Sequence, residues 1–475
     1  MNYNEISITK GKSLREAMNV LDSKGNGIAI IIDENEEFLG VVTSGDIRTA
    51  IINGISPNCS VEKVMNNNPF CVEENNEEEI YKNLEIIKKF PEGGVIKIPV
   101  LNKHKKLVDI MSLAIKINKK IERGIGNENY VKKILIVGGA GYLGSVLVRK
   151  LIDRGYQVKV IDNLTYGDSS IKELYDNKNF EFLKGDIRNI NEIVEAIKGV
   201  DAVVHLASIV GDPASSINPQ QTLESNYFAT KSLAEICKYN QINRFIFASS
   251  CSVYGATETE ELLDENSKLN PVSLYAEIKI RSEKDLLEMT DSNFSPTIFR
   301  MATLYGKSPR MRFDLAVNVL TAKAIFDKTI TIFGGEQWRP FMDVEDAAEA
   351  YIKCLEAPIY KIKGAVFNIG GDNHNHKLIE VGEKIKQIIP NVELKVDRES
   401  QDKRNYKVSF NKAEEILNFK PKKSIEIGIN EISNMLNKGV ITNYKDKIYN
   451  NYNFLNEKKD YLKTIRLILL FVFIR

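Results

Sequence analysis

Residues 131–144 read VKKILIVGGAGYLG, and this stretch decides the fold. The apolar run from Ile134 to Val137 predicts a buried strand, the glycines after it predict a tight turn, and Val146 to Ile152 predict a helix. A strand, a glycine-rich turn and a helix N-terminus together let the diphosphate of a dinucleotide approach the backbone. Such a turn normally opens its domain, yet 130 residues precede it, so the chain has at least two parts.

The composition indicates a globular protein with no marked charge. Its 475 residues are too many for one ordinary core, which predicts two or three domains. The net charge of +1 and the dispersed basic residues give no sign of a nucleic-acid partner. Five scattered cysteines without a CxxC pair predict free thiols in a reducing compartment, and we therefore expect a cytoplasmic protein.

Neither end of the chain carries a recognisable targeting or spanning segment. The first residues, MNYNEISITKGK, lack an apolar signal core. The apolar stretch Leu467 to Ile474 is eight residues long, whereas a spanning helix needs roughly 20. We expect no transmembrane segment and interpret residues 446–475 as a C-terminal tail, either packed or poorly ordered, with a membrane-surface or partner contact as the alternative.

Residues 1–118 contain an internal repeat with a period of about 65 residues. Each copy is predicted to fold as βαββα, the first with strands at 28–33 and 38–44. The stretch GVVTSGDIRTAI (Gly40 to Ile51) resembles the cystathionine-β-synthase (CBS) module, so this region looks like a CBS domain pair. In that family, the positions of Thr43 and Asp46 hold the ribose and phosphate of an adenine nucleotide.

The second copy departs from this pattern, because Ile115 stands at the acidic position and Asp109 at the strand glycine. The second nucleotide site is therefore in doubt. The pair acts either as a sensor of an adenine nucleotide or as a dimerisation scaffold without a ligand. Residues 119–130 lack an apolar face and are interpreted as a linker.

From Val131 onward, short apolar runs alternate with helical segments. Candidate strands lie at 133–137, 157–162, 180–183, 202–206, 244–249 and 296–300. This alternation predicts βαβ units and a doubly wound parallel sheet, that is, an α/β Rossmann domain. We place this domain at 131–445 and include in it a small C-terminal α/β subdomain for the substrate.

Acidic residues after the second and third strands complete a dinucleotide site. Asp162 follows the glycine turn at the spacing expected of the residue that binds the adenosine 2′-hydroxyl. Asp186 is placed to receive the adenine amino group. No arginine follows Asp162 closely enough to bind a 2′-phosphate, which favours NAD over NADP.

Three further residues predict an enzyme. Tyr275 and Lys279 are four residues apart, so they share one face of a predicted helix. A lysine ammonium beside a phenol, like a positive nicotinamide ring, stabilises the phenolate and makes tyrosine a usable base near neutral pH. Ser250, at the end of the strand in FIFASSCSVYG, is placed to hydrogen-bond the same substrate oxygen.

Together, these motifs resemble the extended short-chain dehydrogenase/reductases, in the branch of the nucleotide-sugar epimerases and dehydratases. The resemblance covers Val131 to about Asn437. It implies Ser250, Tyr275 and Lys279 as the catalytic group and NAD as the cofactor. The cofactor contacts that it implies are Gly138, Gly141, Tyr142, Leu143, Gly144, Asp162, Asn163, Asp186, Ile187, Ala207 and Asn226, together with Tyr275 and Lys279.

The second half of the domain predicts the substrate contacts. IFGGEQWRPFMDVEDAAEA (Ile332 to Ala350) is similar to the family block in which an arginine, here Arg339, binds the diphosphate of a nucleotide sugar. Arg404 is a candidate for a second phosphate contact, and Thr303 replaces the asparagine of the RxxNxxG pattern. Arg310 and Arg312 follow, and they either share this contact or fix the loop.

Two features of the sequence reduce the number of reactions expected of the chain. The 4,6-dehydratases carry Asp-Glu directly after the catalytic hydroxyl, where this chain has Cys251 and Ser252, so dehydration by that route is not expected. No metal site is expected either, because His374 and His376 form an isolated pair in a turn.

The sequence thus predicts NAD-dependent epimerisation of a nucleotide-diphosphate sugar through a transient 4-keto intermediate. A nucleotide-sugar dehydrogenase or 4-ketoreductase with net redox shares every motif and is the alternative. A nucleotide-sensing binding protein without turnover is the alternative of another class. We expect a homodimer, and the base, the sugar and the stereocentre are left open.

Overall fold

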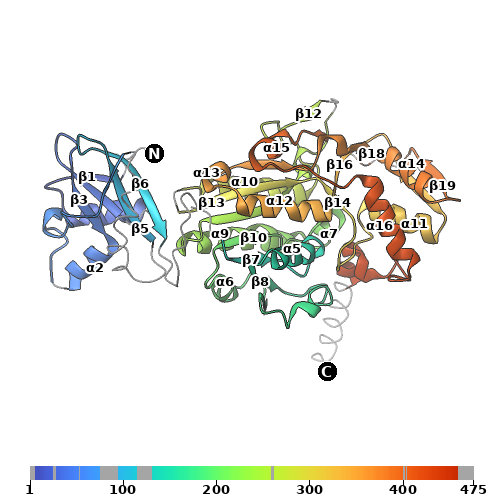
Figure 1. Ribbon diagram of the computed structural model, residues 1–475, viewed down its shortest axis with the longest axis horizontal. Helices are drawn as coiled ribbons and strands as arrows, with labels where there is room; N and C mark the ends of the chain where they lie inside the picture. Colours follow the sequence, from blue (N-terminus) through green and yellow to red (C-terminus); the bar gives the residue numbers. More distant parts are fainter. Residues whose placement is uncertain are drawn as a thin grey trace, which may run out of the picture. The chain divides into compact units, whose positions relative to one another are not determined.

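The computed structural model describes residues 6–24, 28–52, 54–74, 95–114, 131–257, 261–291, 293–399, 402 and 404–457. The chain divides into two compact units, Met1–Ile125 and Gly126–Arg475, coloured blue to cyan and green to red in Figure 1. The predicted linker, residues 119–130, lies outside the described residues. Among the described residues, no helix is both long enough and apolar enough to cross a membrane.

The N-terminal unit contains two three-stranded sheets with the same topology. In the first, β1 (Ser7–Thr9) runs parallel to β2 (Ile28–Ile32), and β2 pairs antiparallel with β3 (Phe38–Thr43). In the second, β4 (Val72–Glu73), β5 (Val95–Leu101) and β6 (Leu107–Ala114) repeat this order and these directions. The helices of the first copy are α1 (Leu14–Lys24) and α2 (Ser44–Ile52). The shared topology agrees with the predicted repeat, although the predicted helix of the second copy, within residues 75–94, is not described.

A seven-stranded parallel sheet forms the centre of the C-terminal unit, in the order β17-β13-β11-β10-β7-β8-β9. The chain moves outward from β7 in one direction through β8 and β9, and in the other from β10 onward, so the strand order reverses between β7 and β10. Ligands bind at this reversal, beyond the carboxyl ends of the strands. The strands are β7 (Lys133–Val137), β8 (Gln157–Asp162), β9 (Phe180–Lys184), β10 (Ala202–His205), β11 (Arg244–Ser250), β13 (Ser295–Met301) and β17 (Val366–Ile369). The first six were predicted, whereas β17 was missed.

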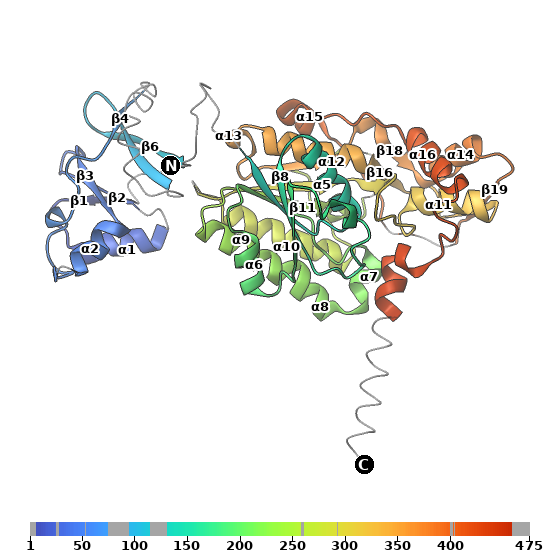
Figure 2. The ribbon, with the colours of Figure 1, turned by 60° about the horizontal axis from the view of Figure 1, so that its bottom comes forward.

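Helices cover both faces of this sheet (Figure 2). Ile134 and Ile136 of β7 pack in one cluster with α5 (Tyr142–Asp153) and α12 (Val344–Glu356). The alternate residues Leu135 and Val137 pack in a second cluster, with α6 (Ile190–Ala196), α9 (Ala229–Tyr239) and α10 (Leu274–Glu288). The continuous apolar run of β7 follows from this burial on both faces, because successive side chains of a strand point to opposite sides.

A smaller lobe of strands and helices completes the unit, as predicted. One of its sheets is formed by β14 (Thr303–Tyr305), β16 (Trp338–Asp343) and β18 (Asn375–Lys377), and another by β15 (Thr329–Phe333) and β19 (Glu393–Asp397). Its helices α11 (Ala316–Phe326), α14 (Leu378–Ile388) and α16 (Ile425–Asn437) share a core of their own, which includes Tyr305, Phe341 and Ile429. The short strand β14 follows β13 directly and so connects this lobe to the sheet.

Candidate active site

The glycine turn between β7 and α5 is closed by backbone contacts that leave no room for a side chain at Gly138 or Gly144. Gly138 has φ +89°, and a Cβ atom on it would lie 2.7 Å from the Ala207 nitrogen. A Cβ atom on Gly144 would lie 2.3 Å from the Gly138 carbonyl oxygen. Gly141 begins α5 without a side-chain cap, so the first N–H groups of the helix are left for another acceptor. This cradle fits a dinucleotide diphosphate.

Asp162, at the end of β8, braces the turn. Its carboxylate accepts hydrogen bonds from the Ala140 nitrogen at 3.0 Å and the Leu164 nitrogen at 2.9 Å. Burial raises the pKa of Asp162, while these two N–H groups act to lower it. Asp162, which is predicted to bind the ribose, therefore lies beside the glycine turn, where a cofactor ribose is expected.

Other predicted cofactor contacts have partners within the protein. Asp186 accepts hydrogen bonds from Arg188 at 3.0 and 2.8 Å and from Asn163 at 3.3 Å. The Tyr142 hydroxyl donates to the Gly306 carbonyl oxygen at 2.6 Å and therefore faces the smaller lobe. Leu143 packs half-buried against the core, and Ile187 is buried.

Asn226 lies in the π-helix Glu224–Phe228 and fixes the loop after β10. Its amide oxygen accepts from the Ile209 nitrogen at 2.8 Å, and its amide nitrogen donates to the Ile209 carbonyl oxygen at 2.9 Å. Both polar groups of this buried side chain are thus committed to the loop. Asn226 therefore shapes the loop that carries Ala207 toward the glycine turn.

Lys279 lies in the interior of α10 and reaches the end of β11. Its ammonium donates to the Ala248 carbonyl oxygen at 2.7 Å and lies 4.6 Å from the centre of the Phe247 ring and 5.6 Å from that of Tyr275. Only 2% of the side chain is exposed. Burial lowers the pKa of Lys279 to about 7, although Glu283, one helical turn farther on, acts to raise it.

Ser250 and Tyr275 meet beside Lys279. Tyr275 is buried, and burial followed by the charge of Asp212 raises its pKa, while Arg312 and a hydrogen bond with the Ser250 hydroxyl act to lower it. Ser250 also accepts a hydrogen bond from the Ser252 nitrogen at 3.2 Å. The structure thus brings the predicted catalytic residues together, at the edge of the sheet where the glycine turn also begins.

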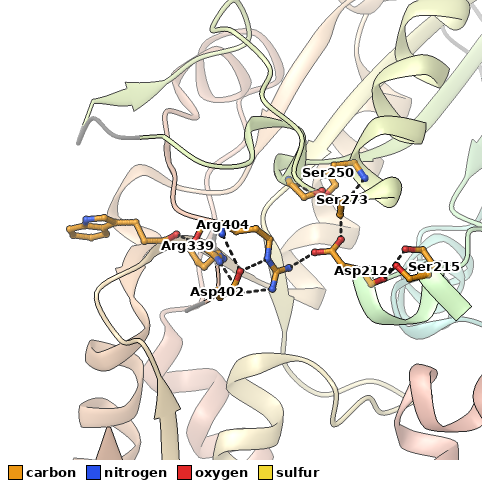
Figure 3. Close-up of polar contacts among 11 residues, drawn as sticks. Asp212, Ser215, Ser250, Ser273, Arg339, Asp402 and Arg404 are labelled. Atoms are coloured by element: carbon orange, nitrogen blue, oxygen red, sulfur yellow. Dashed lines mark hydrogen bonds and ion pairs between the residues drawn. The ribbon is translucent and has the colours of Figure 1, made fainter. Parts of the chain in front are cut away.

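A chain of polar contacts runs from α10, the helix of Tyr275 and Lys279, to the smaller lobe (Figure 3). Ser273, the N-cap of α10, donates to Asp212 at 2.7 Å, and Asp212 lies 3.0 Å from Arg404. Asp402 pairs with Arg404 at 2.5 Å and with Arg339 at 3.0 Å. The two predicted substrate arginines therefore belong to one network with the helix that carries Tyr275 and Lys279. Asp212, Ser273 and Asp402 were not predicted; Ser273 alone carries a local signal, as a serine directly before a helix.

Arg339 is buried, whereas Arg404 is partly exposed. Burial lowers the pKa of Arg339, which is 4% exposed and lies 5.3 Å from the centre of the Tyr406 ring. Burial would raise the pKa of Asp402, but hydrogen bonds from Arg404 lower it to about 2. The predicted contact Thr303 is half-buried in β14, opposite Phe341 of β16. Such fixed cations suit a diphosphate.

The residues after Ser250 offer no exposed acid. The Cys251 thiol donates to the Arg300 carbonyl oxygen at 3.2 Å and is 1% exposed, and burial raises its pKa. Ser252 is buried as well. Neither side chain can act as the acid and base of a dehydratase.

In the N-terminal unit, the two residues predicted to bind a nucleotide are hydrogen-bonded to each other. Asp46 accepts hydrogen bonds from the Thr43 nitrogen at 2.8 Å and the Thr43 hydroxyl at 2.7 Å, and the Asp46 nitrogen donates back to that hydroxyl at 3.3 Å. This is a reciprocal cap at the start of α2. In this structure both residues stabilise a helix end.

Comparisons with known proteins cover both units. Residues 134–370 match the model of the NAD dependent epimerase/dehydratase family, and residues 1–53 match that of the CBS domain. The chain is similar to the uncharacterized UDP-glucose epimerase YtcB of Bacillus subtilis (strain 168), with 31% identity over 315 residues, 63% of this chain and 97% of that protein. It is also similar to UDP-glucuronic acid decarboxylase 1 of Arabidopsis thaliana, with 29% identity over 65% of this chain and 70% of that protein.

Solved structures show the same likeness. The structure of UDP-glucose 4-epimerase with UDP-glucose from Thermotoga maritima covers 65% of this chain and 100% of its own, with 26% identity and a TM-score of 0.58.

Proposed function

Because the chain belongs to the NAD dependent epimerase/dehydratase family and carries a CBS domain at its N-terminus, we propose that it is an NAD-dependent epimerase of a nucleotide-diphosphate sugar. NAD is the cofactor of this family, as the sequence predicted. The observation that carries the proposal is the meeting of Ser250 and Tyr275 beside the buried Lys279. The absence of a carboxylate at positions 251 and 252 favours epimerisation over dehydration.

The residues of the site have distinct roles in this proposal. NAD+, when bound, would supply the acceptor of the C4 hydride, the return of that hydride to the keto sugar, and a positive charge near Tyr275. Tyr275 removes the proton of the sugar 4-hydroxyl, Ser250 donates a hydrogen bond to the same oxygen, and Lys279 stabilises the phenolate. After the flat 4-keto sugar has turned, Tyr275 returns the proton. The net result is inversion at one carbon without an external reductant.

The electrostatics of the free protein explain why the base needs its cofactor. Burial raises the pKa of Tyr275 and lowers that of Lys279 to about 7, so the phenol is protonated before NAD+ binds. A positive charge beside the ring favours the phenolate. We propose that the substrate diphosphate takes the place of Asp402 and Asp212 on Arg339 and Arg404.

The test combines a substrate panel with one variant. The protein is assayed with UDP-, GDP-, CDP- and dTDP-sugars for epimers, for net NADH consumption and for lost carbon dioxide. We expect epimers without net redox, and Tyr275→Phe should lose turnover by orders of magnitude while it keeps NAD. Full activity of Tyr275→Phe, or net NADH consumption, would overturn the proposal. No turnover with firm NAD binding would favour a nucleotide-sensing protein.

For the N-terminal unit we propose regulation by an adenine nucleotide at Thr43 and Asp46, in a homodimer. The proposal is supported by the match to the CBS domain and by the residues at these two positions. The regulation is tested by kinetics and calorimetry with and without ATP, AMP or S-adenosylmethionine. Native mass spectrometry tests the homodimer. Equal kinetics and no heat of binding would remove the regulatory role.

A further inference from the structure

Arg310 lies in the loop after β14, and this loop rests on the start of α5. The Arg310 nitrogen donates to the Ser308 hydroxyl at 3.2 Å, and that hydroxyl donates to the Tyr142 carbonyl oxygen at 2.7 Å. The Ser308 hydroxyl also lies 3.2 Å from that of Ser145. Arg310 is therefore attached to the first turn of the helix that follows the glycine turn.

The Arg310 guanidinium is buried but incompletely paired. The residue is 8% exposed, and its Nε atom is enclosed without a hydrogen-bond partner among the described residues. Its central carbon lies 4.1 Å from the centre of the Tyr166 ring, and an Nη atom donates to the Asn451 amide oxygen at 2.7 Å. A buried guanidinium with a free donor is costly unless an anion joins it.

The two acids whose charges act on Arg310, Asp314 and Asp162, are hydrogen-bonded to other groups. Asp314 accepts two hydrogen bonds from Arg312 at 2.9 Å, and Asp162 accepts from the nitrogens of Ala140 and Leu164. Burial, and then the charge of Arg312, lower the pKa of Arg310 to about 10. No carboxylate is therefore bound to the Arg310 guanidinium in the described part of the chain.

A segment near the C-terminus holds Arg310 in place. Residues 451–457 are helical and follow the 3-10 turn Lys447–Tyr449. The Asn451 nitrogen donates to Asp314 at 3.1 Å, and the Phe454 ring lies 5.2 Å from that of Tyr166, which follows Asp162 in the loop after β8. The segment thereby contacts both Arg310 and the loop of the predicted ribose ligand.

We propose that residues 447–457 belong to the cofactor site, where Asn451 positions Arg310 to bind the diphosphate of the dinucleotide. The inference rests on the proposed use of NAD, and Arg310 becomes a cofactor ligand in addition to those predicted from the motif. A nucleotide sugar also carries a diphosphate, but the attachment of Arg310 to α5 and its contact with the Tyr166 ring, in the loop that follows Asp162, favour the dinucleotide.

Calorimetry on the full chain after cofactor removal tests the proposal, with NAD+, ADP, adenosine and UDP as probes. A lost charge-assisted hydrogen bond predicts that Arg310→Gln weakens the binding of NAD+ and ADP by about 10- to 100-fold. Adenosine and UDP should bind as in the wild type. Asn451→Leu should weaken the binding of NAD+ and ADP by a smaller factor. Arg310→Lys should bind both more tightly than Arg310→Gln does. Tyr452→Ala, in the same turn but 42% exposed, is the matched control and should bind NAD+ normally.

Unchanged NAD+ and ADP binding in Arg310→Gln would overturn the proposal, and so would a loss confined to UDP. If Arg310→Gln does not fold, Asn451→Leu and a chain ending at Asn450 carry the test, with the amount of NAD retained after purification as the readout. These measurements do not use turnover. A protein that lacks epimerase activity but needs Arg310 for NAD+ would refute the proposed function and support this inference.

Discussion

Glu283 and Arg300 form an ion pair in the interior, one helical turn beyond Lys279. The shortest distance between a guanidinium nitrogen and a carboxylate oxygen is 2.8 Å, and the side chains are 4% and 6% exposed. Arg300 also donates to the Tyr254 hydroxyl at 3.1 Å, and the Ser249 hydroxyl donates to Glu283. The pair connects α10 to β11 and β13, so it fixes the helix that carries Tyr275 and Lys279.

Removal of one partner of this pair should destabilise the protein strongly. Glu283→Leu leaves an unpaired buried guanidinium, and we expect a loss of about 3–5 kcal/mol in the free energy of unfolding. Urea titration followed by circular dichroism measures it. Glu283→Leu combined with Arg300→Met should recover most of the loss. Glu288→Leu, which breaks an exposed pair with Lys284 on the same helix, is the control and should cost less than about 1 kcal/mol. A Glu283→Leu protein as stable as that control would contradict the prediction.

Two glycines of the turn should respond differently to alanine. A Cβ atom on Gly144 would lie 2.3 Å from the Gly138 carbonyl oxygen. Gly144→Ala should therefore lower the free energy of unfolding by about 3 kcal/mol and also abolish NAD binding. On Gly141 the nearest atom is 3.2 Å away and φ is −77°, so Gly141→Ala should fold with a loss below about 1 kcal/mol. Its methyl group should still weaken NAD binding, since it lies where the diphosphate approaches. Thermal unfolding and calorimetry separate the two effects, and normal NAD binding by Gly141→Ala would disprove the assignment of the cradle.

Local patterns predicted most of the sheet. The strands β7 and β8 coincide with the predicted runs 133–137 and 157–162, because each is an apolar run bounded by turn residues. The strand β17 was missed because Asn368 interrupts the short apolar run of Val366–Ile369, which is held in the sheet by pairing with the distant strand β13. Short strands depend on tertiary contacts that a local pattern does not contain.

For the candidate site, too, the sequence predicted local relationships but not contacts between distant segments. The helical spacing of Tyr275 and Lys279 brought these residues to one face, as observed. The contact between Asp212 and Arg404 joins segments that are far apart in the chain, and nothing in either segment names the other. A motif position also does not indicate whether the backbone or the side chain of the residue contacts the cofactor. For this reason Tyr142 and Asn226 were predicted as cofactor contacts, whereas their side chains bind Gly306 and Ile209.

The buried amine of Lys279 should leave a signature in the pH dependence of stability. Its pKa is lowered by burial from near 10.5 to about 7. Between these values the unfolded chain binds a proton at Lys279 that the folded chain does not, so stability rises with pH across this window, by at most about 1.4 kcal/mol per pH unit. In Lys279→Met this rise should disappear, as measured by urea titration from pH 7 to pH 9.5. Lys284→Met, at an exposed position of the same helix, should keep the rise of the wild type. An identical slope in Lys279→Met would show that Lys279 keeps its proton in the folded protein over this pH range.

Asp343, the N-cap of α12, should produce the opposite slope at lower pH. Its side chain is buried, one oxygen accepts from the Glu345 nitrogen at 2.8 Å, and the other has no hydrogen-bond partner among the described residues. Burial raises the pKa of Asp343 to about 7, although the Glu345 N–H group and Lys423 act to lower it. The folded chain therefore binds a proton that the unfolded chain releases above about pH 4, and stability falls as the pH rises to 7.

Asp343→Asn keeps the cap and removes this titration. Its stability relative to the wild type should increase between pH 5 and pH 8, by up to about 1.4 kcal/mol per pH unit below pH 7. Urea titrations at both pH values measure the difference. Glu345→Gln, two residues farther along the chain and with a side chain 42% exposed, should change little relative to the wild type between them. If Asp343→Asn lost stability equally at both pH values, Asp343 would be ionised in the folded protein, and Lys423, at 3.9 Å, would be its effective partner.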